Sequence, residues 1–144
     1  MKAALQFAHY HVVETIYKNG LLEPDPDFTD PKFSFKLSLD KDNINHAVVW
    51  LSVELGNPSD EHYVKAVIAG FFRFNSEVIT EETEIISYYE INAASILFPY
   101  LRSLVSDLTS KGESKPVILP TINVHEMMQN SQQADSTDTK TTDE

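Results

Sequence analysis

The first half of the chain alternates apolar and polar residues in segments separated by turns. Residues 7–18 alternate up to Gly20, and the same pattern returns at 33–39 and 47–55, with turn-forming residues at 56–60. A period of two is typical of strands, because successive side chains of a strand point to opposite faces. We predict three strands over these ranges.

A fourth strand is predicted at 62–74, and it is apolar on both faces for much of its length. One face has Val64, Ala66, Ile68, Gly70, Phe72 and Phe74, and the other has Tyr63, Val67, Ala69 and Phe71. An antiparallel sheet normally leaves one face to water. We therefore expect helices on one side of the sheet and a partner on the other.

The connection at 21–32 contains three prolines, which exclude both a helix and a central strand. Connections of this length inside a small domain are often functional. Phe28 lies within it, and this ring either contributes to a binding groove or anchors the connection to the body of the protein.

After residue 78 the period changes to that of a helix. Thr80 has the chemistry of an N-cap and is followed by acidic residues. An apolar stripe then recurs at spacings of three and four, formed by Leu97, Leu101, Leu104, Val105 and Leu108. Pro99 predicts an early turn or a kink, and Lys111 with Gly112 predicts the C-cap.

The chain is expected to be one domain at 1–128 followed by a disordered acidic tail at 129–144. Asn123 and Glu126 have the spacing of a capping box, which predicts a short final helix. The residues after it have no apolar member except Ala134, so they cannot bury enough surface to become ordered.

The formal net charge of −11 makes nucleic acid and anionic membranes poor partners and favours basic or unfolded polypeptides. The same acidity also serves solubility.

The chain has no cysteine, which excludes disulfides and thiolate sites. The start of the sequence does not resemble a signal peptide and no apolar run is long enough to span a membrane, so we expect a cytoplasmic protein without membrane insertion.

No group of residues predicts catalysis, a metal site or a cofactor. His9 and His11 are expected to share a strand face, and a hairpin would bring His46 near His62, but no cysteine or nearby aspartate completes a zinc site. The acids at 81, 82 and 84 suit the first turn of a helix better than acid–base chemistry. The chain has no nucleotide-binding loop. We expect no enzyme.

The most specific segment is Ile-Leu-Phe-Pro-Tyr-Leu-Arg at 96–102. It is followed by Ser-Lys-Gly at 110–112 and by Leu-Pro-Thr-Ile-Asn-Val-His-Glu-Met-Met at 119–128, and Gly-Phe-Phe at 70–72 precedes it. These segments resemble the SecB family of chaperones. The resemblance extends over about residues 7 to 130 and is strongest at 95–128.

The resemblance implies an α+β fold with a four-stranded antiparallel sheet and two helices on one face. Pairs of protomers would extend the sheet, and two pairs would form a dimer of dimers, a homotetramer. Family members act as holdases, which bind unfolded polypeptides without ATP and keep them translocation-competent or free of aggregation. Some SecB-like proteins guard an antitoxin instead. An adaptor that binds one folded partner through the sheet is the rival from a different class.

The resemblance also assigns residues to two surfaces. The client-binding groove would be formed by Leu21, Leu22, Phe28, Phe33, Met127 and Met128. Methionine suits such a groove because its flexible thioether adapts to many side chains. The oligomer interface would be formed by Leu97, Leu101, Leu104, Leu108, Val64 and Ala66.

Export chaperones of this family dock the SecA translocase motor through acids on the sheet. The first pair of docking positions corresponds to Gly20 and Pro24, with Glu23 and Asp25 nearby. The second pair corresponds to Tyr63 and Lys65, where the family has an aliphatic residue and an acid. Lys65 reverses the charge at that position. The sequence therefore departs from the family at the motor-docking positions, and this departure does not affect the residues assigned to client binding.

Overall fold

The computed structural model describes most of the predicted domain. It covers residues 5–24, 28, 30–40, 42–43, 45–74, 82–112 and 116–120. The predicted final helix and the predicted acidic tail lie outside the described residues. Asp25, Met127 and Met128 lie outside them as well.

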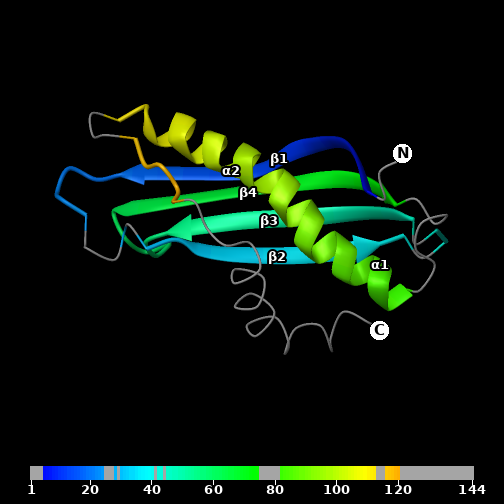
Figure 1. Cartoon of the computed structure of the whole chain (residues 1–144). Coiled ribbons are helices and arrows are strands. Elements are labelled where there is room, and N and C mark those ends of the chain that lie inside the picture. The colour runs from blue at the N-terminus through cyan, green and yellow to red at the C-terminus, as the bar shows by residue number, and fades with distance from the viewer. Residues whose placement is uncertain are drawn as a thin grey trace.

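The four predicted strands are confirmed and form one antiparallel sheet (Figure 1). They are β1 (Leu5–Asn19), β2 (Lys32–Leu39), β3 (His46–Leu55) and β4 (His62–Phe74). The strand order is β1-β4-β3-β2, so β4 lies in the interior of the sheet. That position explains why β4 has the most apolar sequence.

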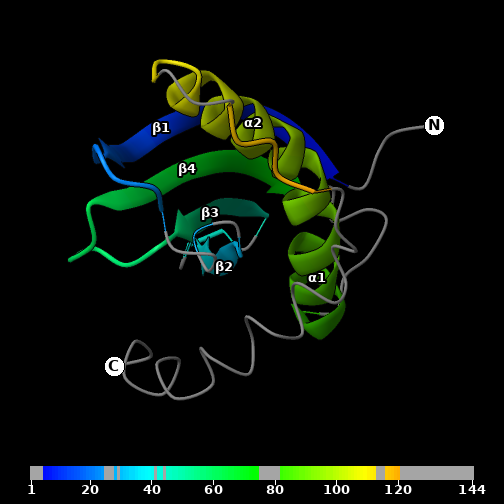
Figure 2. The ribbon, with the colours of Figure 1, turned by 90° about the vertical axis from the view of Figure 1, so that its left-hand side faces the viewer.

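One long helical segment crosses one face of the sheet, as Figures 1 and 2 show. It consists of α1 (Glu82–Tyr88), a π-helical stretch η2 (Tyr89–Ala93) and α2 (Ala94–Thr109). Pro99 does not mark an early turn, because it lies inside α2. The departure from α-helical geometry lies at η2 instead.

The core lies between the sheet and this helical layer. Its members are apolar residues from alternate positions of the strands and from one side of the helices, together with Leu119 from the segment after α2. Those with no exposed surface include Val49, Leu51, Val53, Leu55, Val64, Ala66, Ile68, Tyr89, Leu97, Leu101, Val105 and Leu119. Gly70 allows α2 to approach β4, since a Cβ there would lie 2.6 Å from a methyl group of Leu97.

The helix ends at Thr109 rather than at a glycine cap. The Thr109 side chain accepts a hydrogen bond from the backbone of Val117 at 2.8 Å, which turns the chain back along α2. Gly112 does not have a positive φ. It is required for close packing instead, because a Cβ there would lie 2.5 Å from the Tyr17 hydroxyl. None of the described helices is long and apolar enough to cross a membrane.

Candidate functional site

No described helix packs on the face of the sheet opposite α1 and α2, and we call it the open face. Neighbouring side chains on this face nevertheless bury Tyr63 and Ala69. The members of the open face follow from strand alternation and from the pairing register. They are Gln6, His9, His11, Glu14, Ile16 and Lys18 of β1; Tyr63, Lys65, Val67, Ala69, Phe71 and Arg73 of β4; His46, Val48, Trp50, Ser52 and Glu54 of β3; and Lys32, Ser34, Lys36 and Ser38 of β2.

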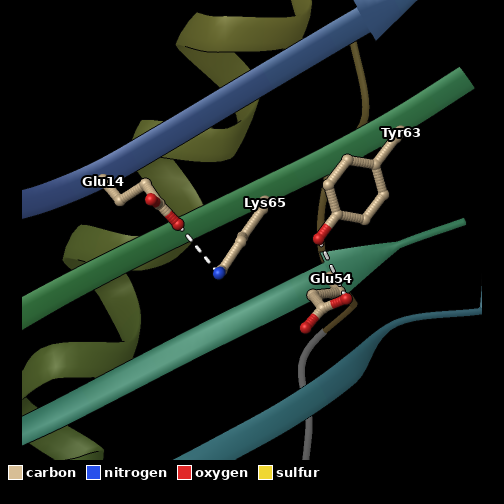
Figure 3. A network of polar contacts seen from close by, with 4 residues as sticks. All are labelled: Glu14, Glu54, Tyr63 and Lys65. Atoms are coloured by element: carbon tan, nitrogen blue, oxygen red, sulfur yellow. Dashed lines mark hydrogen bonds and ion pairs between the residues drawn. The ribbon is translucent and has the colours of Figure 1, made fainter. Parts of the chain in front are cut away.

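Two polar contacts lie side by side on the open face (Figure 3). The Lys65 ammonium forms an ion pair with Glu14 Oε1 at 2.8 Å. The Tyr63 hydroxyl donates a hydrogen bond to Glu54 Oε2 at 3.0 Å. The two predicted docking residues on β4 are therefore each bound to a carboxylate of a neighbouring strand.

The environment of these contacts shifts two pKa values. Burial raises the pKa of Tyr63 to about 12, and the hydrogen bond to Glu54 and the negative charges of Glu54 and Glu14 act in the same direction. The hydrogen bond to Glu14 raises the pKa of Lys65, with desolvation opposing it. Because both side chains of the ion pair are partly exposed, at 32% and 47%, solvent screens it strongly.

Tyr63→Phe is expected to reduce the decline of the free energy of unfolding at high pH. In the unfolded chain a tyrosine ionises near pH 10. The stability that comes from the neutral Tyr63 hydroxyl is therefore fully present below about pH 10 and is lost as the pH rises to about 12. We expect the variant to remove about 2 kcal/mol of this decline in the free energy of unfolding, measured by urea titration at several pH values.

Glu54→Gln is the matched variant, because it removes the charge beside Tyr63 but keeps an oxygen that accepts the hydrogen bond. It should give an intermediate slope between pH 10 and 12. Tyr89, whose pKa burial also raises to about 12, contributes to the wild-type slope and is left in place. A decline in Tyr63→Phe equal to that of the wild type would contradict the assignment.

The long connection and the turn between β3 and β4 enclose a hollow of about 440 Å³. Leu22 and Phe28 line it, together with polar residues that include Glu23 and His62. His62 Nε2 bonds to the Leu22 carbonyl, and its ring lies edge-on to Phe28 at 5.9 Å. Phe28 also packs against the core. The hollow is therefore held in place by His62, and Phe28 acts as an anchor whether or not it also binds a client.

The other predicted groove residues are distributed differently. Leu21 is fully exposed and Leu22 is 72% exposed, so both offer apolar surface to the solvent. Phe33 lies on the helix-facing side of β2, with its ring 6.0 Å from that of Phe98. The structure thus brings Leu22 and Phe28 together in one hollow and places Phe33 under the helix.

The predicted interface residues divide into two groups. Val64, Ala66, Leu97 and Leu101 have no exposed surface within the protomer. They form the core between sheet and helix, so in this conformation they have no surface to offer to another subunit. Leu104 and Leu108 are only partly buried, and the interface stays a prediction for these two.

An exposed aromatic pair beside the β1 edge was not predicted from the sequence. The rings of Tyr10 and Tyr100 lie 4.7 Å apart and are 36% and 40% exposed. Phe7 lies 5.7 Å from Tyr100 and joins the pair to the core. The register of β1 shifts between Phe7 and His9, which places Phe7 and Tyr10 on the same face, and it shifts again between Val12 and Glu14. Such irregularities are not visible in a simple alternation.

Two histidines of the open face, His9 and His11, form an aromatic cluster, whereas His46 lies opposite Arg73 and is not a neighbour of His62. His9 stacks on Phe71 at 4.6 Å, and His11 meets the edge of the same ring at 5.3 Å. Among the described residues there is no group of three or more His, Cys, Asp or Glu arranged to hold a metal ion.

Comparisons with known proteins give a consistent result. The family model for SecB, described as preprotein translocase subunit SecB, matches residues 21–135. An uncharacterized protein of Methanocaldococcus jannaschii is 30% identical over 149 residues, which cover 96% of this chain and 92% of that protein. The protein-export protein SecB of Orientia tsutsugamushi (strain Boryong) is 28% identical over 108 residues, 71% of this chain and 66% of that protein.

A solved structure has a similar fold. It is a SecB-like chaperone of Mycobacterium tuberculosis in complex with a peptide from an antitoxin. The TM-score is 0.63 at 23% sequence identity, over 83% of this chain and 91% of that chain. At this sequence identity the similarity shows a shared fold, namely the four-stranded sheet and the long helix.

Proposed function

Since this chain belongs to the SecB family, whose model matches it over 115 of its 144 residues, from 21 to 135, we propose that it is an ATP-independent holdase for unfolded polypeptides. The observation that carries the proposal is the exposure of Leu21 and Leu22 on the connection where the resemblance places the groove. Large apolar side chains at such exposure mark binding surfaces when they are clustered.

The charge of the chain supports this class of client. A net charge of −11 favours polypeptide segments with neutral or basic character. Under the proposal, Leu22 and Phe28 form one wall of the groove, and Met127 and Met128 contribute to the other. Clients would be held as extended segments, free of aggregation or ready for translocation, in a cytoplasmic homotetramer whose contacts include Leu104 and Leu108.

A dedicated antitoxin chaperone is the second candidate function. The observation that favours it is the fold shared with the Mycobacterium tuberculosis SecB-like chaperone that was solved with an antitoxin peptide. Motor docking by SecA receives less support, because Lys65 stands at a position that is acidic in the family and is bound to Glu14.

An aggregation assay tests the holdase proposal against its rivals. Two unrelated client proteins are diluted from denaturant with increasing amounts of the chain, without ATP, and light scattering is followed. We expect both clients to be protected at stoichiometric amounts. Protection of neither client would refute the proposal and favour a specific adaptor. With an antitoxin as a third client, protection of the antitoxin alone would support the second candidate.

A further inference from the structure

The open face of the sheet has the opposite charge to the rest of the protein. Five of the eleven Lys and Arg residues of the chain lie on it, against two of the twenty-two acids. The cations are Lys18, Lys32, Lys36, Lys65 and Arg73, and the acids are Glu14 and Glu54. The face thus carries a formal charge of +3, and since the whole chain carries −11, all other residues together carry −14.

Three of these cations are available for a partner. Within the part of the chain that the structure describes, the single ion pair is that of Lys65 with Glu14, so Lys32, Lys36 and Arg73 have no carboxylate partner there. The Lys36 ammonium lies over the Trp50 ring, 5.3 Å from its centroid. A carboxylate that reached this point would meet a cation already positioned by an aromatic ring.

The same face has a hollow of about 420 Å³ at the end where Arg73 lies. Its lining combines apolar residues such as Val48 and Phe71 with His9, His46 and Arg73, and it includes one acid, Asp40, just after the end of β2. A hollow of this size has room for one large side chain, with polar groups placed around it to orient the ligand.

We propose that the open face is a docking surface for an acidic polypeptide segment that carries a large apolar side chain. The carboxylates of the segment would pair with Lys32, Lys36 and Arg73, while its apolar side chain would fill the hollow over Phe71. The acidic residues 129–144 of the chain itself have no apolar side chain larger than that of Ala134, so they would leave the hollow unfilled. This inference does not rest on client holding, although Lys32 also lines the hollow that contains Leu22 and Phe28.

A protein partner fits these observations better than a nucleic acid. A phosphate backbone gains affinity from many simultaneous contacts with Lys and Arg. Three free cations supply few such contacts, and one of them, Lys32, lies opposite Glu54 in the register of β2 and β3. The net charge of −11 adds long-range repulsion of a phosphate backbone. A short acidic segment needs only the local cations and the apolar hollow.

Binding can be measured with the full chain. The probe is a short fluorescein-labelled peptide of glutamates around one central phenylalanine, followed by anisotropy, with its lysine counterpart and a single-stranded oligonucleotide as comparisons. Trp50 is the only tryptophan of the chain and lies on the open face, so its emission reports binding at this face independently. We expect the glutamate peptide to bind, to change Trp50 emission, and to bind better than both comparisons.

Two double variants make the test specific. Lys36→Glu with Arg73→Glu should weaken binding of the glutamate peptide by about tenfold or more, because it reverses two charges on the face. Arg102→Glu with Lys111→Glu makes the same change of net charge on α2 and the turn after it, and should change the affinity by less than about twofold. Equal affinity of the first variant and the wild type, or tighter binding of the oligonucleotide than of the peptide, would overturn the proposal.

Discussion

Leu101→Ala is expected to lower the free energy of unfolding by about 3 kcal/mol, a large part of the total stability of a domain of this size. Leu101 has no exposed surface and lies in the core between α2 and the sheet. Truncation to alanine removes buried methyl groups and leaves a cavity that the rigid sheet cannot fill by collapsing. Denaturant unfolding followed by Trp50 fluorescence measures the loss.

Leu104→Ala is the control for this prediction. Leu104 lies on the same helix but is only partly buried, so its truncation should cost less, about 1 kcal/mol at constant oligomeric state. Native mass spectrometry of both variants measures whether each truncation changes the oligomeric state, which distinguishes a core residue from an interface residue. If Leu101→Ala dissociated the oligomer without destabilising the protomer, Leu101 would be an interface residue after all.

The sheet was predictable from the sequence because alternation encodes both the strand and its buried face. The predicted strand at 62–74 coincides with β4, and the others agree within two residues at each end. The turn at 56–60 was predictable as well, because Gly56 has a φ of +77°, where glycine is favoured over other residues.

The interface residues could not be separated from the core by periodicity. The stripe from Leu97 to Leu108 indicates which side of the helix is apolar, but it does not indicate what covers each residue. In the structure the sheet completely buries Leu97 and Leu101, whereas Leu104 and Leu108 lie nearer the margin of the core. The same limit applies to Val64 and Ala66, which face the helix.

The ion pair of Lys65 with Glu14 was not predictable either, because it depends on the register between β1 and β4. In that register Lys65 is opposite Ile16 and diagonal to Glu14, which is two residues from Ile16 on the same face and forms the ion pair. The basic character of the open face, by contrast, left a signal in the sequence. Lys32, Lys36, Lys65 and Arg73 all stand at positions of one strand face, but a net charge of −11 conceals this segregation.

Leu21→Asp with Leu22→Asp is expected to raise the amount of chaperone that halves client aggregation by about tenfold. Both side chains are exposed, so charged replacements cost little stability, and any loss of protection reflects lost client contacts. The aggregation assay with two unrelated clients measures the effect, and urea unfolding of the variant confirms that the fold is unchanged.

Ser34→Asp with Ser38→Asp is the matched control, because it adds the same two charges to exposed positions of β2 on the open face. If charge alone weakened client binding, both double variants would lose protection. If the connection provides the apolar contacts, only the leucine variant loses it. Full protection by Leu21→Asp with Leu22→Asp would place the client groove elsewhere on the molecule, while the assay on the wild-type chain would still decide whether it is a holdase.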